Sequence, residues 1–193
     1  MRVGVFGGTF DPPHVGHLIV AQDAMESLGL DRVRLVPAHV SPLKTEGPTG
    51  TPPDLRLEMV RRAAAGHPGF EISGAEVERD PPSYTVDTLR EFSEAEPDVE
   101  WTLLLGADQW ADFDRWRDPG TIAELARIVV LTRAGADARP VRAGVDHEVL
   151  EVPRVDVSAS DIRRRARTGR SIRYLVPEAV RTLIDEKGLY ATC

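Results

Sequence analysis

Cysteine is almost absent from this sequence of 193 residues. Its one cysteine is Cys193, so no disulfide can form within the chain. A chain without disulfides fits a reducing compartment. The sequence also lacks an apolar run of about 18 residues, which a membrane-spanning helix needs, and no leader-like segment precedes the first predicted strand. We therefore expect a cytoplasmic protein with no membrane partner.

Lysine is nearly as scarce, since only Lys44 and Lys187 occur among the 24 basic residues. Acidic residues outnumber the basic ones, and the formal net charge of -7 counts against a protein whose main activity is coating nucleic acid. The 41% apolar and 28% charged residues are ordinary for a globular protein. We expect a single domain over residues 1–193, and the sequence leaves room for a homo-oligomer.

Short β-prone runs alternate with segments of helical periodicity along the chain. The predicted strands cover residues 2–6, 33–37, 70–73, 101–106, 127–132 and 149–152. The predicted helices cover residues 15–28, 53–65, 84–94, 121–126, 160–167 and 177–186. This alternation predicts an α/β fold with a mainly parallel sheet and helices on both faces. Ligands of such sheets bind beyond the carboxyl ends of the strands, so motifs at those ends are candidate site residues.

The first strand-to-helix turn carries the strongest motif, Gly7-Gly8-Thr9-Phe10-Asp11-Pro12-Pro13-His14-Val15-Gly16-His17. A helix N-terminus presents backbone N–H groups and a positive dipole end to an anion, and glycines let the backbone approach closely. His14 and His17 are three residues apart, so a helix that begins near Pro13 puts both imidazoles on one face of its first turn. The motif therefore predicts a phosphate site.

Zinc is the rival ligand for these two histidines. Zinc histidines normally come with further His, Cys or carboxylate ligands. The remaining histidines are scattered along the chain, at His39, His67 and His147, and the cysteine is the last residue. We therefore predict no metal held by protein ligands alone.

A second candidate region follows the predicted strand 101–106. Gly106 and Asp108 stand at its carboxyl end, where Asp108 is suited to bind ribose hydroxyls or to cap the next helix. The polar stretch after them holds Trp110 and Trp116. One of these rings is suited to stack on an aromatic ligand, and core packing is the alternative for each.

Two further helix starts carry hydroxyl side chains. Ser83 is expected to cap the helix that follows Pro81-Pro82, while Thr85 and the N–H groups beside it suit a carboxylate or a carboxamide. Ser158 and Ser160 begin the helix 160–167, with Arg163 in its first turn. This second combination suits phosphate, because the planar fork of arginine matches phosphate oxygens.

The segment 41–53 is rich in proline and glycine and contains Lys44. We interpret it as a surface loop. A loop of this length in a compact domain is either a functional element or a plain connector.

Taken in order, these segments resemble the bacterial nicotinate-nucleotide adenylyltransferases, a family of the nucleotidylyltransferase superfamily whose hallmark is a His-x-Gly-His turn. The resemblance spans nearly the whole chain. Besides the turn and the Lys44 loop, it rests on Arg56-Leu57-Glu58-Met59-Val60, Ser83-Tyr84-Thr85-Val86-Asp87-Thr88, Leu105-Gly106-Ala107-Asp108, Trp116, Val157-Ser158-Ala159-Ser160-Asp161-Ile162-Arg163 and Tyr174-Leu175-Val176-Pro177. Val157 and Ser160 stand where the family usually has Ile and Thr, and the histidine that often precedes the loop lysine is replaced by Leu43.

The resemblance implies a Rossmann-like, doubly wound fold in which a helical region at about 158–193 completes the ATP site. It implies transfer of the adenylyl group of ATP to nicotinate mononucleotide with Mg²⁺, giving deamido-NAD and pyrophosphate. His14, His17 and Arg163 would act in catalysis. The implied ATP-binding residues are Gly7, Gly8, Phe10, His14, His17, Gly106, Asp108, Ser158, Ser160 and Arg163. The implied mononucleotide-binding residues are Thr9, Lys44, Thr85 and Trp116.

Two other functions stay open on the sequence. The first is an adenylyltransferase that prefers nicotinamide mononucleotide, since carboxylate and carboxamide differ by one group. The second is a nucleotide-sensing module that binds ATP without turning it over. The presence of His14, His17, Lys44 and Arg163 favours an enzyme, because a module freed from catalysis has no physical need for all four.

Overall fold

A computed structural model describes residues 1–40, 50–133 and 145–191 of the chain. Its centre is a six-stranded sheet in the order β3-β2-β1-β4-β5-β6, in which every paired strand is parallel. The strands are β1 (Arg2–Gly8), β2 (Arg32–Pro37), β3 (Phe70–Ile72), β4 (Glu100–Gly106), β5 (Arg127–Arg133) and β6 (Glu148–Val152). All six predicted strands are confirmed, each with one end shifted by one or two residues.

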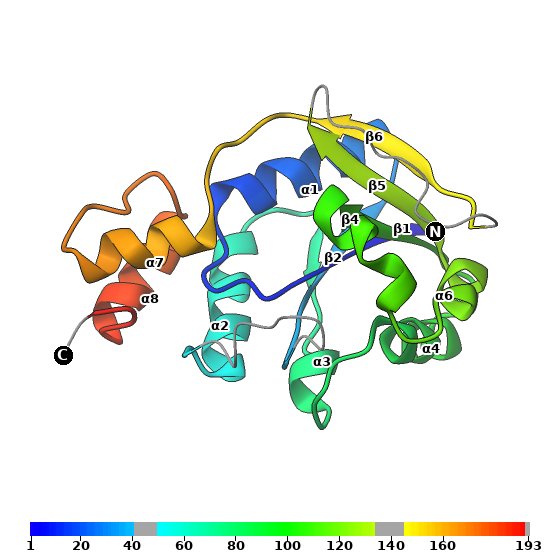
Figure 1. Cartoon of the computed structure of the whole chain (residues 1–193), viewed down its shortest axis with the longest axis horizontal. Helices are drawn as coiled ribbons and strands as arrows, with labels where there is room; N and C mark the ends of the chain where they lie inside the picture. The colour runs from blue at the N-terminus through cyan, green and yellow to red at the C-terminus, as the bar shows by residue number, and fades with distance from the viewer. Residues whose placement is uncertain (41–49, 134–144, 192–193) are drawn as a thin grey trace.

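The helices alternate with these strands along the chain (Figure 1). They are α1 (Val15–Ser27), α2 (Pro53–Ala64), α3 (Ala75–Glu78), α4 (Thr85–Ala95), α5 (Ala107–Ala111), α6 (Pro119–Leu125), α7 (Ala159–Arg167) and α8 (Glu178–Glu186), with a 3₁₀ turn η1 at Phe113–Arg115. The six predicted helices are confirmed. The short elements α3, α5 and η1 were not predicted, because a helix of three to five residues has too few turns to show an apolar period.

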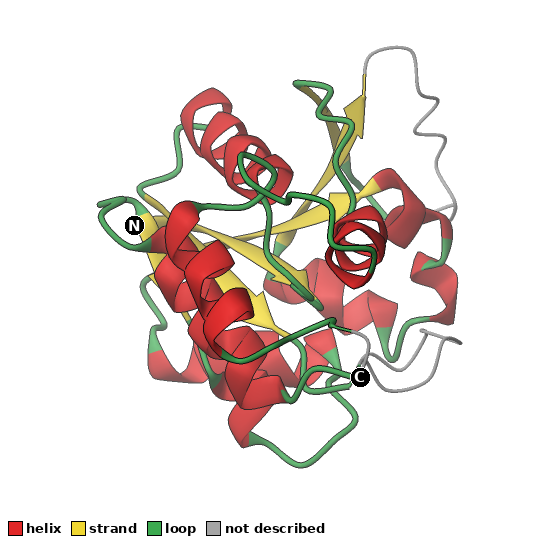
Figure 2. Ribbon diagram, turned by 90° about the vertical axis from the view of Figure 1, so that its left-hand side faces the viewer, coloured by secondary structure: helices red, strands yellow, loops and turns green. Residues whose placement is uncertain are grey.

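Helices cover both faces of the sheet, and Figure 2 shows the strands running between them. On one face, Val5 of β1 and Leu103 of β4 pack with Leu89 of α4 and Ile122 of α6. On the opposite face, Leu104 of β4 packs with residues of α1 and α2, among them Ala21 and Val60. Successive strand residues thus enter different cores, which is why the central strands are apolar without alternation.

The last two helices lie outside this three-layer arrangement, beside α2 (Figure 1). Met59 of α2, Ile162 of α7 and Leu183 of α8 share a third apolar cluster in which each side chain is at most 1% exposed. Ile162, the buried apolar residue of the arginine-rich helix α7, therefore fixes this helix against α2. This packing holds the amino end of α7 in reach of the turn after β1.

The strand order reverses direction between β1 and β4, since the chain proceeds outward from β1 to β3 and then from β4 to β6 on the other side. Such a reversal leaves a crevice beyond the carboxyl ends of the two central strands, where ligands of doubly wound sheets bind. Gly8 ends β1 and Gly106 ends β4. Both predicted site motifs therefore begin at the crevice.

Candidate active site

The turn between β1 and α1 brings the two histidines of the motif into contact. Their rings are stacked, with centroids 3.7 Å apart and an interplanar angle of 25°. The helix begins at Val15 with His14 as its N-cap residue, and the backbone N–H of His14 donates to Nδ1 of His17 over 3.1 Å. Because Nδ1 of His17 accepts this bond, the proton of a neutral His17 ring belongs on Nε2. Stacking and this hydrogen bond therefore fix the two imidazoles relative to each other.

Two glycines of the turn make room for aromatic rings. A Cβ on Gly16 would lie 3.1 Å from Nδ1 of His14, so the ring of His14 folds over a residue with no side chain. A Cβ on Gly8 would lie 3.1 Å from Cζ of Phe10. Phe10 is 3% exposed and its ring meets the edge of the His17 ring, with centroids 5.0 Å apart. The ring of Phe10 thus packs against the His17 ring and is buried. A ligand could therefore contact the backbone of Phe10 but not its ring.

Burial sets the charge of His14. The side chain is 8% exposed, and desolvation lowers the pKa of His14 to about 4. Within the described part of the chain, its buried Nδ1 has no hydrogen-bond partner. The ring is therefore neutral near pH 7 and keeps a polar atom unsatisfied, a costly arrangement that is common where a ligand completes the bonding.

The amino end of α1 is less open to an anion than the sequence predicts. The backbone N–H of Val15 donates to the carbonyl of Leu175 over 3.1 Å, and that of His17 donates to the carbonyl of His14 over 3.0 Å. Two of the first three helical N–H groups therefore have acceptors already. The expectation of a row of free N–H groups was wrong, because a segment 160 residues later in the chain packs against the helix start, which local sequence cannot show.

Residues of α7 stand across from this turn. Ser158 is the N-cap of α7, accepting a bond from the N–H of Asp161 over 3.2 Å, and its hydroxyl lies 3.2 Å from that of Ser160. Nη1 of Arg163 donates to the carbonyl of Asp11 over 2.7 Å. The structure therefore brings the predicted Ser-Ser-Arg group to the His14 turn, and Arg163 joins the two directly.

The carboxyl end of β4 presents Gly106 and Asp108. Asp108 is exposed in the first turn of α5, and the residue that caps this helix is Gly106, whose N–H donates to Oε1 of Gln109 over 3.1 Å. The alternative role of Asp108 as the helix cap is wrong, because the helix begins at Ala107, two residues earlier than that role requires. Asp108 is exposed, in keeping with the role predicted for it toward ribose hydroxyls.

The two tryptophans after β4 occupy different environments. Trp110 is 1% exposed and packs against Phe113 and His147, with ring centroids 4.9 and 4.6 Å away. It is a core residue and cannot stack on a ligand. Trp116 is partly buried, and its ring centroid lies 5.5 Å from that of Phe113. Of the two rings, only Trp116 retains an accessible surface.

Trp116 and Thr85 lie on neighbouring segments. The guanidinium of Arg117 sits 4.7 Å from the centroid of the Tyr84 ring and 3.3 Å from the carboxylate of Asp87. Because Arg117 follows Trp116 and Tyr84 precedes Thr85, these contacts hold the η1 segment against the amino end of α4. The grouping of the two residues predicted for one mononucleotide is therefore supported.

Ser83 does not cap α4. Tyr84 is the N-cap residue, and Oγ of Ser83 instead accepts the backbone N–H of His39 over 2.9 Å. The N–H of Ser83 in turn donates to the carbonyl of Val40 over 3.0 Å. The serine therefore joins the end of β2 to the start of α4, and the prediction of a cap was wrong because it considered only contacts within the helix.

Arg56 belongs to one of the motifs that carry the family resemblance, but the sequence assigns it no role. The structure makes it the most deeply buried charge of the site, at 1% exposure, and burial lowers its pKa. Its nitrogens donate to four carbonyls, those of Thr9 (2.8 Å), Ala38 (2.6 Å), His39 (2.7 Å) and Thr51 (3.3 Å). Arg56 therefore fixes Thr9 against the end of β2. An arginine in register with Leu57, Val60 and Ala64 on the apolar side of α2 was the signal for this role.

Lys44 lies outside the described residues, as does most of its loop. The described parts of the chain contain no group of three His, Cys, Asp or Glu side chains arranged to hold a metal. They also contain no helix long and apolar enough to cross a bilayer.

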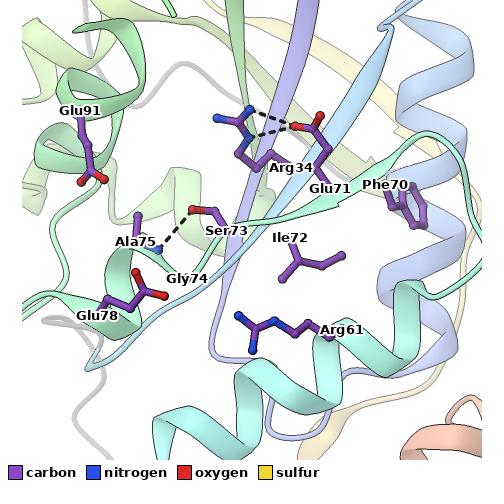
Figure 3. Close-up of a pocket in the computed structure, with 10 residues that line it drawn as sticks. All are labelled: Arg34, Arg61, Phe70, Glu71, Ile72, Ser73, Gly74, Ala75, Glu78 and Glu91. Carbon is purple, nitrogen blue, oxygen red and sulfur yellow. Dashed lines mark hydrogen bonds and ion pairs between the residues drawn. The ribbon is translucent and has the colours of Figure 1, made fainter. Parts of the chain in front are cut away.

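A separate hollow of about 720 Å³ lies beside the edge strand β3, lined by residues such as Arg34, Glu71 and Glu78 (Figure 3). It contains none of the predicted site residues. The charge of Arg34 is neutralised there, since its guanidinium pairs with Glu71 (2.9 Å) and Glu96 (2.8 Å) and lies over the ring of Phe92. The candidate site residues lie around the crevice between β1 and β4 and not in this hollow.

A doubly wound parallel sheet with paired histidines, hydroxyls and an arginine at its switch point defines a nucleotide-binding α/β protein. Comparison with known proteins agrees. The family described as Cytidylyltransferase-like matches residues 5–165. The chain belongs to this family and, within it, to the nicotinate-nucleotide adenylyltransferases.

Curated relatives support the narrower assignment. The chain is 45% identical over 200 residues to a probable nicotinate-nucleotide adenylyltransferase of Gemmatimonas aurantiaca, covering 98% of this chain and 92% of the relative. It is 41% identical over 192 residues to the protein of that name from Exiguobacterium sibiricum, with both chains covered completely. Among solved structures, the Plasmodium falciparum nicotinic acid mononucleotide adenylyltransferase complexed with NaAD superposes with a TM-score of 0.79 at 16% identity, covering 98% of this chain and 97% of that one. This last likeness concerns the fold.

Proposed function

We propose that the chain transfers the adenylyl group of ATP to nicotinate mononucleotide, releasing pyrophosphate and forming deamido-NAD. The observation that carries the proposal is the stacked pair of His14 and His17 at the switch point of the sheet, with Arg163 of α7 hydrogen-bonded to the same turn. The names of its relatives in Gemmatimonas aurantiaca and Exiguobacterium sibiricum point to the same activity.

In this proposal one half of the crevice receives ATP. Gly7 and Gly8 give the phosphates room, His14 and His17 contact them, and Phe10 supports His17. The hydroxyls at the start of α7 and the fork of Arg163 hold the rest of the polyphosphate. Gly106 and the exposed Asp108 meet the ribose of the adenosine. The helical region from about residue 158 onward thus completes the ATP site, within one domain.

The other half receives nicotinate mononucleotide. Thr9 and Lys44 meet its phosphate, and the amino end of α4 at Thr85 receives the carboxylate of the pyridine. The accessible ring of Trp116 stacks on the pyridine ring. The contacts of Arg117 with Tyr84 and Asp87 support this grouping, since they hold Trp116 and Thr85 on adjoining segments.

The reaction needs positioning and charge stabilisation more than proton transfer. The attacking phosphate is already an anion, so no base is required to activate it. Charge grows at the α-phosphoryl oxygens and on the departing pyrophosphate. A neutral His17 with its proton on Nε2 can donate to that growing charge, and the neutral ring of His14 stacks beside it. No covalent enzyme intermediate forms, and the configuration at the α-phosphorus inverts.

Mg²⁺ accompanies ATP in this proposal. An ion that takes most of its oxygen ligands from phosphates and water needs no cage of protein side chains. When bound, it supplies neutralisation of the phosphate charges. We place the reaction in the cytoplasm, in keeping with a chain that has one cysteine.

Pyrophosphate release is the direct test. Purified protein with ATP, Mg²⁺ and nicotinate mononucleotide should release pyrophosphate and form the dinucleotide in equal amounts. A folded protein that binds ATP and releases none would favour the nucleotide-sensing module. Competition between nicotinate and nicotinamide mononucleotides in the same assay decides the preference, and faster use of the amide would overturn the assigned substrate.

A further inference from the structure

The strongest contact that the function leaves unused joins the two ends of the chain. The hydroxyl of Tyr190 donates to Oδ1 of Asp11 over 2.5 Å, across 179 positions of sequence. Asp11 lies in the His14 turn and is 3% exposed. A buried carboxylate needs donors to replace water, and the phenol supplies one.

The backbone around Tyr190 is held in an unusual conformation to make this contact. Tyr190 has φ of 65°, in the left-handed region that non-glycine residues seldom adopt. The N–H of the preceding residue, Leu189, bonds to the carbonyl of Ile184 over 2.9 Å and so ties this turn to α8. Burial and the adjacent carboxylate raise the pKa of Tyr190, so its hydroxyl remains a donor at physiological pH.

Asp11 is also where the ATP half of the crevice meets α7. Its carbonyl accepts Nη1 of Arg163 over 2.7 Å, while its carboxylate accepts Tyr190. One residue of the turn is thus held from two sides, by α7 and by the segment after α8. Without the Tyr190 bond, the hydrogen bond from Arg163 to the Asp11 carbonyl would remain to hold this residue.

We infer that Tyr190 is a positioning residue for adenylyl transfer, which through Asp11 fixes the histidine turn against α7 so that Arg163 and the two imidazoles converge on the ATP phosphates. The inference rests on the proposed function. It predicts a larger effect on ATP than on the mononucleotide. Trp116, assigned to the pyridine ring, packs against a different apolar cluster from that of Tyr190, and the carbonyl of Thr9, on the same turn as Asp11, is held separately by Arg56.

The test is Tyr190→Phe, which removes one oxygen atom and keeps the ring. Tyr174→Phe is the matched control, since Tyr174 also has a left-handed backbone (φ 68°) but its side chain is 84% exposed. We expect Tyr190→Phe to lower kcat about tenfold or more and to raise both KM and Kd for ATP at least about threefold, because a bond to a charged acceptor is lost. KM for nicotinate mononucleotide should stay within about twofold of the wild type, as should every constant of Tyr174→Phe.

A second variant removes the acceptor. Asp11→Ala should weaken ATP binding and turnover, and adding Tyr190→Phe to it should cause little further loss, since both changes delete the same bond. If Tyr190→Phe does not fold, the test uses Asp11→Ala alone. Its kcat and its KM and Kd for ATP are then measured at a temperature below the unfolding midpoint of that variant.

Two results would overturn the inference. One is a Tyr190→Phe enzyme with the constants of Tyr174→Phe. The other is a fall in kcat that matches the loss of folded protein, with KM and Kd for ATP unchanged, which is the behaviour of a purely structural residue. Calorimetric titration of the wild type with Mg-ATP separates this failure from that of the proposed function. A wild type that binds ATP without releasing pyrophosphate refutes the function, and the effect of Tyr190→Phe on Kd still judges the positioning role.

Discussion

The imidazole of His14 lies stacked on that of His17, with ring centroids 3.7 Å apart, and is itself 8% exposed. Burial lowers the pKa of His14 to about 4 from its usual 6.5. The unfolded chain therefore binds a proton at His14 in a pH range where the folded chain does not. Each drop in pH through that range favours the unfolded state.

The pH dependence of stability follows from this difference. Between about pH 7 and about pH 5, His14 should remove about 2 kcal/mol from the free energy of unfolding. Other groups titrate too, so the comparison is with His14→Gln, which should lose about 2 kcal/mol less over the same interval. Urea unfolding at the two pH values measures both. Equal losses in wild type and variant would show that His14 is not buried as a neutral ring.

Removing His17 should affect turnover more than substrate binding. His17→Ala deletes a donor aimed at charge that grows in the transition state, so kcat should fall about 10²- to 10³-fold with KM for the mononucleotide changed little. His67→Ala is the matched control, since His67 stacks on Phe70 away from the crevice. Steady-state kinetics of both variants check this. Unchanged turnover in His17→Ala would refute the assignment.

Gly16 should tolerate no side chain, because its Cβ would lie 3.1 Å from Nδ1 of His14. We expect Gly16→Ala to displace the His14 ring and lower kcat at least about tenfold, with a smaller effect on the unfolding midpoint. Gly120→Ala in α6 is the control, since a Cβ there meets nothing within 4 Å. Kinetics and thermal unfolding of the pair distinguish a displaced ring from a general loss of stability.

Arg56 should stabilise the fold as well as the site. Arg56→Met removes the donor from the buried carbonyl of Ala38 and the partly buried carbonyls of Thr9 and His39, and each acceptor left without a partner costs about 1–3 kcal/mol. We expect a loss of at least about 3 kcal/mol in the free energy of unfolding, against about 0.5 kcal/mol or less for the exposed Arg61→Met on the same helix. Denaturant titrations of the two variants provide the measurement. A similar small loss in both would mean that the carbonyls find other donors.

Trp116 should act on one substrate alone. Stacking of a ring on an aromatic base contributes about 1–3 kcal/mol, so Trp116→Ala should raise KM for nicotinate mononucleotide about 5- to 150-fold. KM for ATP should change little, and Trp116→Phe should recover part of the loss because it restores a smaller ring. An equal rise in both KM values would indicate that Trp116 supports the fold and not the pyridine.

The strands and the longer helices of this protein follow from local patterns that can be read in its sequence. Apolar runs of four to six residues predicted all six strands, and helical spacing predicted the longer helices, because burial imposes a period on the residues of any one element. Three site groups were predicted in the same way, since the His14 turn, the end of β4 and the start of α7 each lie within one strand-to-helix junction.

Contacts between distant segments were decided only by the tertiary structure. Local rules suggest capping roles that Ser83 and Asp108 do not have. The hydroxyl of Ser83 accepts the backbone N–H of His39, after β2, and Gly106 is the N-cap of the helix that contains Asp108. The covering of the α1 amino end by Leu175, the four carbonyls around Arg56 and the bond of Tyr190 to Asp11 join residues that share no local period.

The sequence by itself therefore determined which residues are candidates for the chemistry and on which strand-to-helix junctions they stand. The tertiary structure decided how those junctions face one another, which charges are buried and which ring remains accessible. The physical reason is that hydrophobic periodicity and helix starts depend on near neighbours, whereas desolvation and hydrogen-bond satisfaction depend on whatever the folded chain brings alongside.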